Sequence, residues 1–412
     1  MEKEMKSFST SASLLIMMKN KKLFISSILL VLIMIFSLMI NTSFTKSISN
    51  GNNQPYLMNQ FTPKDNDIIF TIKSVKKTDK NSIENQSWEQ ATLMINENLA
   101  SFQSTSLLPY LHQAEIILND WLKNSSPTYE TYLYQARLAQ MQHFFDSALT
   151  QLDYAIAINP EKPEAYLLKA YIKINSGKPL EAIPLCKKSI HLSPLLSLSC
   201  LSTAQARIGQ EDTAYEQLQK ALVHFNNLTD IEKSEAYYSL AEISIQKNIE
   251  SDAYFTAALA HQPNNMNARI RFIDALIEKK EYALSQTIIK DYDQHPAIKT
   301  RKLYIDKILN KKTSHASYQE MLEYFQTQSL IDQNYSSREQ AFFYFYIENN
   351  PELSLKASYQ NWKNHPEPED ALMVIKCAVL LQDQQKIQEI MQWKNNSGYQ
   401  DERFNLIMNN QL

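Results

Sequence analysis

Two segments of the chain repeat each other at a spacing of 34 residues. Their small, apolar and proline positions correspond in order: Ala148, Leu152, Ala155 and Pro160 in the first segment, Ala182, Cys186, Ser189 and Pro194 in the second. Small residues recur where two helices would cross closely, and a proline recurs where the second helix must stop. The repeat therefore predicts stacked helix pairs, in which each pair leaves an apolar face that the next pair covers.

A unit of 34 residues with two helices resembles the tetratricopeptide repeat (TPR). The resemblance implies an all-α fold, a TPR-like right-handed α-solenoid of antiparallel helix pairs, and such arrays bind other proteins far more often than they catalyse reactions. Single positions depart from the family pattern. Gln135 and Lys169 stand where the family most often has Leu, and Lys173 and Arg207 stand where it favours Tyr, so the repeats are degenerate.

The chain contains few glycines and is mildly acidic. Only four of its 412 residues are glycine, whereas glycine makes up roughly 7% of ordinary proteins. Turns that need a positive φ and glycine-rich phosphate loops are therefore scarce, which favours helices throughout. The net charge is −3, and residues 1–46 hold six lysines against two acidic residues, so the rest of the chain is near −7. An acidic body argues against nucleic acid as a partner.

Apolar spacing divides the body of the chain into helix pairs. We expect TPR repeats over residues 86–297 and degenerate C-terminal helical repeats over residues 298–412. The two best-defined pairs have their helices at 129–142 and 145–158, and at 163–176 and 179–192.

Prolines and one glycine are expected to punctuate these pairs. Pro163 is expected to start a helix, because a proline at the first helical position loses no hydrogen bond. Gly177 is expected to turn the chain, and Pro194 to end the second helix of its pair. Pro263 and Pro296 are expected to close the fifth and sixth pairs.

The C-terminal region contains a run that is apolar on every side, from Ala341 to Ile347. Such a helix is expected to lie buried between its neighbours, and stacking of carbohydrate or peptide on its aromatic rings is the alternative. Further on, Asn361-Trp362 and Glu367-Pro368-Glu369-Asp370-Ala371 resemble a run at the helical end of bacterial envelope TPR proteins of unassigned function. This resemblance implies one continuous domain and supplies no reaction.

The N-terminal segment determines the expected compartment. Residues 23–40 carry no charge and approach the ~20 residues that a membrane-spanning helix needs. Lysines are denser before this segment than after it, so the positive-inside rule places the basic N-terminus, residues 1–22, in the cytoplasm. We therefore expect a single-pass inner-membrane anchor with the body in the periplasm. A cleaved signal peptide that secretes the body to the periplasm is the alternative, with Met1, Met17 or Met18 as the start, and an inverted topology is a third interpretation.

Residues 41–85 are rich in Asn, Ser, Thr and Lys and are expected to form a flexible linker. A flexible coil of about 45 residues has an end-to-end distance of roughly 35–40 Å. Such a linker would hold the helical body close to the bilayer without fixing its position.

Side chains that could carry catalysis or bind a metal are scattered along the chain. The eight histidines fall singly and lack the spacing of metal ligands. No phosphate loop, nucleophile elbow or Cys-x-x-Cys motif occurs in the sequence. We therefore expect no enzyme activity, no cofactor and no metal site, and a catalytic site assembled in three dimensions is the alternative.

Two of the three cysteines are placed for a disulfide. Cys186 is expected near the middle of one helix and Cys200 near the start of the next, so that their Cα atoms could lie within the ~4.4–6.8 Å that a disulfide requires. In an oxidising compartment the bond would form, and otherwise both residues are small apolar core residues. Cys377 is left over and is expected to be buried in a helix.

The first helix of each TPR pair lines a concave groove, so the resemblance implies that its outward face contacts a partner. Chaperone-tail TPR proteins use Lys and Asn on this face, whereas Leu133 and Leu167 occupy the place of that Lys here. An apolar helix or an extended peptide is therefore the expected ligand. The candidate partner-binding residues on the two best-defined first helices are Leu133, Arg137, Gln140, Met141, Leu167, Tyr171 and Ile174.

These features together predict a non-catalytic protein–protein interaction scaffold of the bacterial cell envelope. Its expected partners are other envelope proteins, with the membrane contacted through the N-terminal helix. Two alternatives stay open: an exported accessory subunit of an enzyme acting on envelope polysaccharide, and an unrecognised hydrolase.

Overall fold

Every regular element among the described residues is a helix. The computed structural model describes residues 87–311, 314–331 and 337–409, all of which belong to one compact unit, Ile69–Leu412. The segments predicted as the N-terminus, the membrane anchor and the linker, over 1–22, 23–40 and 41–85, lie outside these residues. Among the helices that the structure does describe, none is both long enough and apolar enough to cross a membrane.

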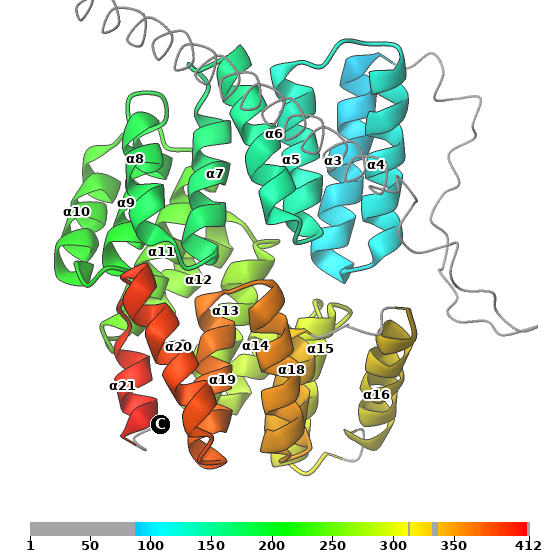
Figure 1. The fold of residues 1–412 in the computed structure, drawn as a ribbon, viewed down its shortest axis with the longest axis vertical. Coiled ribbons are helices and arrows are strands. Elements are labelled where there is room, and N and C mark those ends of the chain that lie inside the picture. Colours follow the sequence, from blue (N-terminus) through cyan, green and yellow to red (C-terminus); the bar gives the residue numbers. More distant parts are fainter. Residues whose placement is uncertain (1–86, 312–313, 332–336, 410–412) are drawn as a thin grey trace, which may run out of the picture. The chain divides into compact units, whose positions relative to one another are not determined.

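The helices follow one another as pairs joined by short connections, and the described region is an all-α solenoid (Figure 1). The first six pairs are α3 (Trp88–Thr105) with α4 (Leu108–Lys123), α5 (Tyr129–Met141) with α6 (Phe145–Ile158), α7 (Pro163–Asn175) with α8 (Pro179–Lys188), α9 (Pro194–Ala206) with α10 (Glu211–His224), α11 (Asp230–Gln246) with α12 (Asp252–His261), and α13 (Met266–Glu278) with α14 (Tyr282–Ile289). The later elements are α15 (Pro296–Ile308), α16 (Ser314–Ile331), α17 (Arg338–Phe342), the π-helical turn η1 (Phe343–Ile347), α18 (Pro351–Asn364), α19 (Pro368–Leu380), α20 (Gln384–Ser397) and α21 (Glu402–Met408).

Local sequence starts several of these helices. Ser87, Thr128 and Thr229 precede α3, α5 and α11, and the side chain of each accepts a hydrogen bond from the backbone N–H three residues further on. Pro163 is the first residue of α7, and Gly177 has a φ of +68° in the turn to α8, a conformation that glycine adopts without strain. The predicted roles of Pro163 and Gly177 are confirmed.

Two of the predicted helix ends are wrong. Pro194 and Pro296 do not close a helix but are the first residues of α9 and α15. Helix α8 already ends at Lys188, and in the turn that follows the N–H of Ser193 donates to the carbonyl of Ser189 at 3.0 Å. A proline loses no hydrogen bond at the first position of a helix, so it is compatible with a helix start just after such a turn.

The small residues of the 34-residue repeat lie at the helix crossings. Ala148 of α6 and Ala182 of α8 are completely buried, and Ala148 belongs to the same core cluster as Ala136 of α5 and Ala165 of α7. A methyl side chain at a crossing lets two backbones approach closely, while a larger residue such as Leu152 fills the groove beside it. Each pair is thereby covered by the next, as the repeat predicts.

The aromatic run at 341–347 spans the end of α17 and all of η1. Phe342, Phe343 and Ile347 are buried. The ring centroid of Phe343 lies 5.4 Å from that of Phe325 and 5.5 Å from that of Tyr318. The prediction that this segment packs between its neighbours is confirmed for these three buried side chains.

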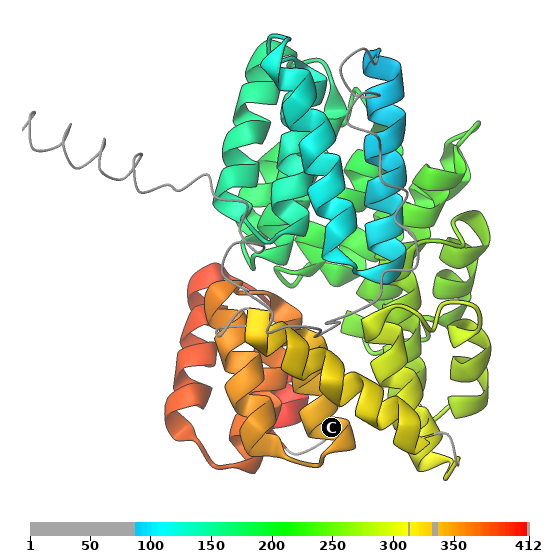
Figure 2. The same ribbon diagram turned by 90° about the vertical axis from the view of Figure 1, so that its right-hand side faces the viewer.

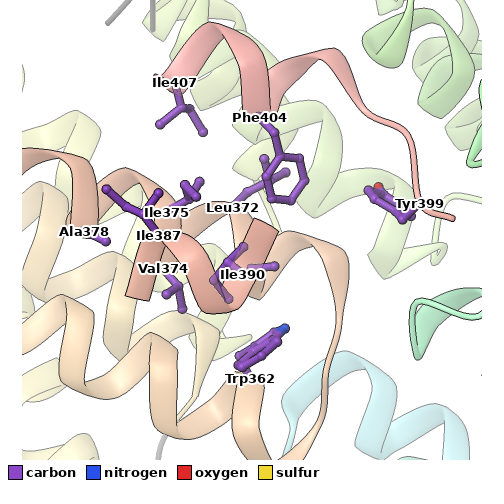
Figure 3. Packing of buried hydrophobic residues seen from close by; sticks show 11 residues of the cluster. Trp362, Leu372, Val374, Ile375, Ala378, Ile387, Ile390, Tyr399, Phe404 and Ile407 are labelled. Atoms are coloured by element: carbon purple, nitrogen blue, oxygen red, sulfur yellow. The ribbon is translucent and has the colours of Figure 1, made fainter. Parts of the chain in front are cut away.

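The last helices build a separate part of the core. Side chains from α18, α19, α20 and α21 converge there with Tyr399, which lies between α20 and α21 (Figure 3). The large buried members of this cluster are Trp362, Leu372, Val374, Ile375, Ile387, Ile390, Tyr399, Phe404 and Ile407.

The C-terminal helices also contact the turns of the middle pairs. The backbone N–H of Gln400 donates to the carbonyl of Arg207 at 2.7 Å, and Nε2 of Gln246 donates to the carbonyl of Gln400 at 3.1 Å. A Cβ atom on Gly177 would lie 2.4 Å from Cζ2 of Trp393. The absence of a side chain at position 177 therefore allows the Trp393 ring to pack against this turn. Figure 2 shows the early pairs, in blue and cyan, above the orange and red C-terminal helices.

Candidate binding surface

The seven candidate partner-binding residues lie on two first helices, and the structure exposes them unequally. On α5, all four candidates are partly accessible. The guanidinium carbon of Arg137 lies 5.9 Å from the ring centroid of Tyr134, a distance at which a cation–π contact orients the arginine. We call these four residues the α5 set: Leu133, Arg137, Gln140 and Met141.

On α7, the expected accessibility is wrong for Leu167 and Ile174. Their side chains are 7% and 4% exposed, and they share a core cluster with Cys200 and Leu201 of α9. The cause is that α7 packs against both its partner α8 and the first helix of the next pair, α9. Helix α9 thus covers the face of α7 that the sequence predicts to be accessible to a partner.

Tyr171 lies beside the same contact. Its ring packs against the cluster, and its hydroxyl oxygen is buried without a hydrogen-bond partner in the described residues. Burial, followed by the charge of Glu235 on α11, raises the pKa of the Tyr171 phenol, and burial raises the pKa of Glu235 to about 6. Buried polar groups are normally hydrogen-bonded, so the unpaired hydroxyl of Tyr171 is an exception among the seven candidates.

A chain of buried ion pairs links the first helices of the middle pairs. Arg207, at the end of α9, donates to one oxygen of Glu242 on α11 at 3.1 Å, and Arg271 of α13 donates to the other oxygen at 2.8 Å. One carboxylate thus bridges three successive first helices. Burial opposes the charge on Arg271, but Glu242 and Glu369 raise the pKa of this guanidinium above its ordinary value.

The same chain of ion pairs continues into the C-terminal helices. Arg271 also donates to Glu369 of α19 at 3.2 Å, and Arg403 of α21 donates to both oxygens of Glu369 at 2.8 and 3.1 Å. Arg403 donates in turn to Asp401 at 2.7 Å, and the Tyr399 hydroxyl donates to Asp401 at 3.1 Å. Although burial opposes it, Arg271 and Arg403 hold the pKa of Glu369 well below its ordinary value. We call this set of bonded residues the arginine network: Arg207, Glu242, Arg271, Glu369, Tyr399, Asp401 and Arg403.

The charged groups of this network are committed to one another. Among the described residues, no group of three or more His, Cys, Asp and Glu side chains is arranged to hold a metal ion.

The thiol of Cys377 is buried and donates to Oγ of Ser354 at 3.3 Å. Burial raises the pKa of Cys377 to about 11, so the thiol is a poor nucleophile at neutral pH.

Comparison with known proteins gives structural likenesses at low identity. No family model matches the chain, and no curated protein matches it. TTC0263, a thermophilic TPR protein of Thermus thermophilus, aligns at 19% identity over 45% of this chain and 99% of that chain, with a TM-score of 0.37. Pseudomonas aeruginosa PilF aligns at 16% identity over 49% of this chain and 97% of that chain, with a TM-score of 0.34. Human IFIT1, solved as a dimer with PPP-AAAA, aligns at 12% identity over 74% and 72% of the two chains, with a TM-score of 0.42.

The chain resembles the tetratricopeptide-repeat proteins. Within this TPR-like array, the two helices that hold Cys186 and Cys200 belong to successive pairs, α8 ending one and α9 beginning the next. The structure joins the two cysteines in a disulfide, with their Cα atoms 5.7 Å apart. The geometry therefore permits the bond, and its formation in the cell stays a prediction because it depends on the compartment.

The sequence did not reveal the arginine network of this TPR-like array. Arg207 stands out in the sequence as a departure from the Tyr that the repeat favours, and Glu369 lies within the run that resembles envelope TPR proteins. Those two positions are the only features of the sequence analysis that point to members of the network. The partners themselves are distant, since Arg207 meets Glu242 across 35 residues and Tyr399 across 192.

Proposed function

We propose that the protein is a non-catalytic scaffold of the bacterial cell envelope, in which the α5 set binds a peptide or helix of another envelope protein. The observation that carries this proposal is the accessibility of the α5 set on a first helix whose other side is fixed. Ala136 and Leu138 of α5 are buried, so the helix has little freedom to rotate. Apolar, amide and guanidinium groups presented together on a rigid helix suit an amphipathic segment.

The proposed location is the inner membrane, with one membrane pass and the body in the periplasm. The uncharged segment 23–40 and the lysines before it support this topology. Release of the body to the periplasm after signal cleavage is the alternative. In either case the partners would be proteins of the envelope, with no nucleic acid and no small-molecule cofactor.

Affinity purification of the detergent-extracted full chain tests this function. Arg137→Glu is expected to reduce recovery of the co-purifying partner about tenfold or more, because interfacial arginines often carry a large share of the binding energy. Ala157→Glu is the matched control, since Ala157 is an exposed residue on α6 of the same pair. Equal recovery of the same proteins by the parent and the Arg137→Glu variant would remove the α5 set as the binding surface.

A further inference from the structure

Early and late helix pairs meet through histidines. The ring of His143, in the turn between α5 and α6, lies against the ring of His365, which follows α18, with centroids 4.8 Å apart and the ring planes tilted by 34°. Phe145 meets the same His365 ring edge-on at 5.5 Å. At a second place, Oγ of Ser106 at the end of α3 lies 2.9 Å from Nε2 of His295, the residue before α15. In Figure 1 the lower ends of α3 and α5 face α15 and α18.

His295 makes its contacts as a neutral ring. Its Nδ1 accepts a hydrogen bond from the backbone N–H of Ala297 at 3.2 Å, which caps α15. An accepting nitrogen carries no proton, so the neutral ring has its proton on Nε2 and donates it to Ser106. Protonation of Nδ1 would remove the cap and would place a positive charge at the N-terminus of a helix, where the helix dipole opposes it.

The pair His143 and His365 is also built for neutral rings. Two imidazolium rings with centroids 4.8 Å apart would repel each other, so each charge opposes protonation of the other ring. Burial, followed by the charge of His143, lowers the pKa of His365 to about 4. Burial also lowers the pKa values of His143 and His295.

The charged groups that face these rings come from three helices. Asp370 of α19 favours protonation of His143 and His365, and Glu339 of α17 favours protonation of His143 and His295. Arg338 of α17 opposes protonation of His143, and Arg301 of α15 opposes it at His295. Arg338 also bonds Asp370 at 2.9 and 3.0 Å, which weakens the attraction of this carboxylate for a proton on the histidines.

We propose that the histidine contacts form an acid-sensitive latch between the early pairs, α3 to α6, and the late elements α15 and α18. At neutral pH the latch holds these parts together, and protonation in a mildly acidic environment releases them. The arginine network is expected to stay closed under the same conditions, because its arginines hold the pKa values of Glu369 and Asp401 below their ordinary values although burial opposes it. Acid would therefore free the early pairs while α19 and α21 stay attached to the middle pairs. This regulation goes beyond the proposed scaffold function and is tested without a partner.

The direction of the effect follows from the difference in proton affinity between the two states. In the open state each histidine has its ordinary pKa near 6.5, and in the closed state the pKa is lower. Well above pH 6.5, from about pH 7.5, almost no histidine is protonated in either state and the latch is fully stable. As the pH falls from 6.5 toward 4, the open state binds protons that the closed state resists, so the closed state loses stability. For His365, whose pKa in the closed state is about 4, lowering the pH to 5 raises the ratio of open to closed molecules by up to about 30-fold.

Distances between spin labels on the full chain test the latch. One pair of labels is placed at Ser147 and Asn364, exposed residues of α6 and α18 that lie close in sequence to His143 and His365. The control pair is placed at Thr213 and Asn396, exposed residues of α10 and α20. The labels are attached through an unnatural amino acid, so that the native cysteines are left intact.

Between pH 7.5 and pH 5.0, the ratio of long to short distances for the 147–364 pair is expected to rise at least about tenfold, and to reverse when the pH is restored. The control pair is expected to give the same distances at both pH values. An unchanged distance distribution of the 147–364 pair would overturn the latch.

A variant that cannot titrate separates the histidines from other effects of acid. His143→Asn tolerates the φ of +62° at this position, His365→Phe keeps a ring against Phe145, and His295→Asn keeps a residue that caps helices well. The triple variant is expected to keep the short distance at pH 5.0, and opening equal to that of the parent would overturn the proposal. If circular dichroism shows that the triple variant is unfolded at pH 7.5, His365→Phe alone decides. It is expected to lower the open fraction at pH 5.0 several-fold, and no change would overturn the latch.

Discussion

At the scale of single residues, burial divides the candidate set in two. Arg137 reaches accessible surface beside the ring of Tyr134, whereas Leu167 is enclosed between α7 and α9. A charged side chain introduced at position 137 stays hydrated, whereas a charged side chain at position 167 would be desolvated. Burial of an unpaired charge is strongly unfavourable, so the two positions should respond very differently to acidic substitutions.

Leu167→Asp is expected to lower the free energy of unfolding by about 3 kcal/mol or more, and Leu167→Ala by about 2–5 kcal/mol. Arg137→Glu, the matched control on the preceding first helix, is expected to change it by less than about 1 kcal/mol. Denaturant unfolding followed by circular dichroism measures the three values. Equal losses for Leu167→Asp and Arg137→Glu would contradict the burial of Leu167 between the pairs.

The disulfide gives a second prediction at this scale. Peptide mapping without reduction, on protein purified from the envelope, is expected to recover Cys186 linked to Cys200 and Cys377 as a free thiol. Reduction should lower the stability by about 2–4 kcal/mol without abolishing the fold, because the closed loop is short, with a sequence separation of 14. Recovery of three free cysteines from exported protein would end this hypothesis.

Individual crossing residues could be predicted from the sequence, but the arginine network could not. Ala148 and Ala182 recur at a fixed interval, and their role follows from the local geometry of one helix pair. Arg207 and Glu369 have partners on helices that are distant in the sequence, so no periodic pattern marks them. The pattern also could not show that α9 covers Leu167, because it places a residue on a helix but not which of the neighbouring helices it faces.

At the scale of elements, the positions of helices were predictable and their ends were less so. The starts of α5 and α7, Tyr129 and Pro163, agree with the predicted pairs. The prediction that Pro194 ends a helix is wrong, because proline is compatible both with a helix stop and with the first turn of a helix, and here it begins α9. Helix α15 runs through the predicted boundary between 297 and 298, and the division into those two regions stays a prediction.

The turn at Gly177 provides a prediction for the docking of α20. Gly177→Ala is expected to destabilise the protein by well over 1 kcal/mol, because the residue has a positive φ and its Cβ would overlap Trp393. Gly209→Ala is the matched control, since it has a positive φ but its Cβ would lie 3.4 Å from Gln400, an ordinary contact. Thermal unfolding and Trp fluorescence compare the two variants. A loss for Gly209→Ala as large as that for Gly177→Ala would show that backbone strain, and not the contact with Trp393, sets the effect.

At the scale of the whole molecule, the repeat predicts the stacking of neighbours and says nothing of contacts between distant pairs. Each repeat needs only the next to cover its apolar face, so the stack is specified locally. The contacts of Arg207 with Tyr399 and of His143 with His365 depend on how many pairs the chain has and how it turns between them. The number of pairs and the turns between them are properties of the whole array, so they cannot be predicted from the sequence of a single repeat.

The uncharged segment 23–40 gives a prediction for the topology of the full chain. A reporter fused after Asn85 is expected to be active outside the cytoplasm, and the protein should stay with the membrane fraction after a carbonate wash. Reporter activity in the cytoplasm would contradict the proposed location. A soluble product with a new N-terminus beyond residue 40 would instead identify a cleaved signal peptide.

Site-specific photo-crosslinking in living cells tests the central claim, that the α5 set is a binding surface for other proteins. A variant with a photoreactive amino acid at position 137 is compared with a variant that has it at position 157. Ala157 is exposed on the second helix of the same pair. We predict discrete adducts of higher mass from position 137, reduced by Gln140→Ala in the same chain, and few or none from position 157. Equal adducts from both positions, or none from position 137 in cells that contain the folded protein, would contradict it.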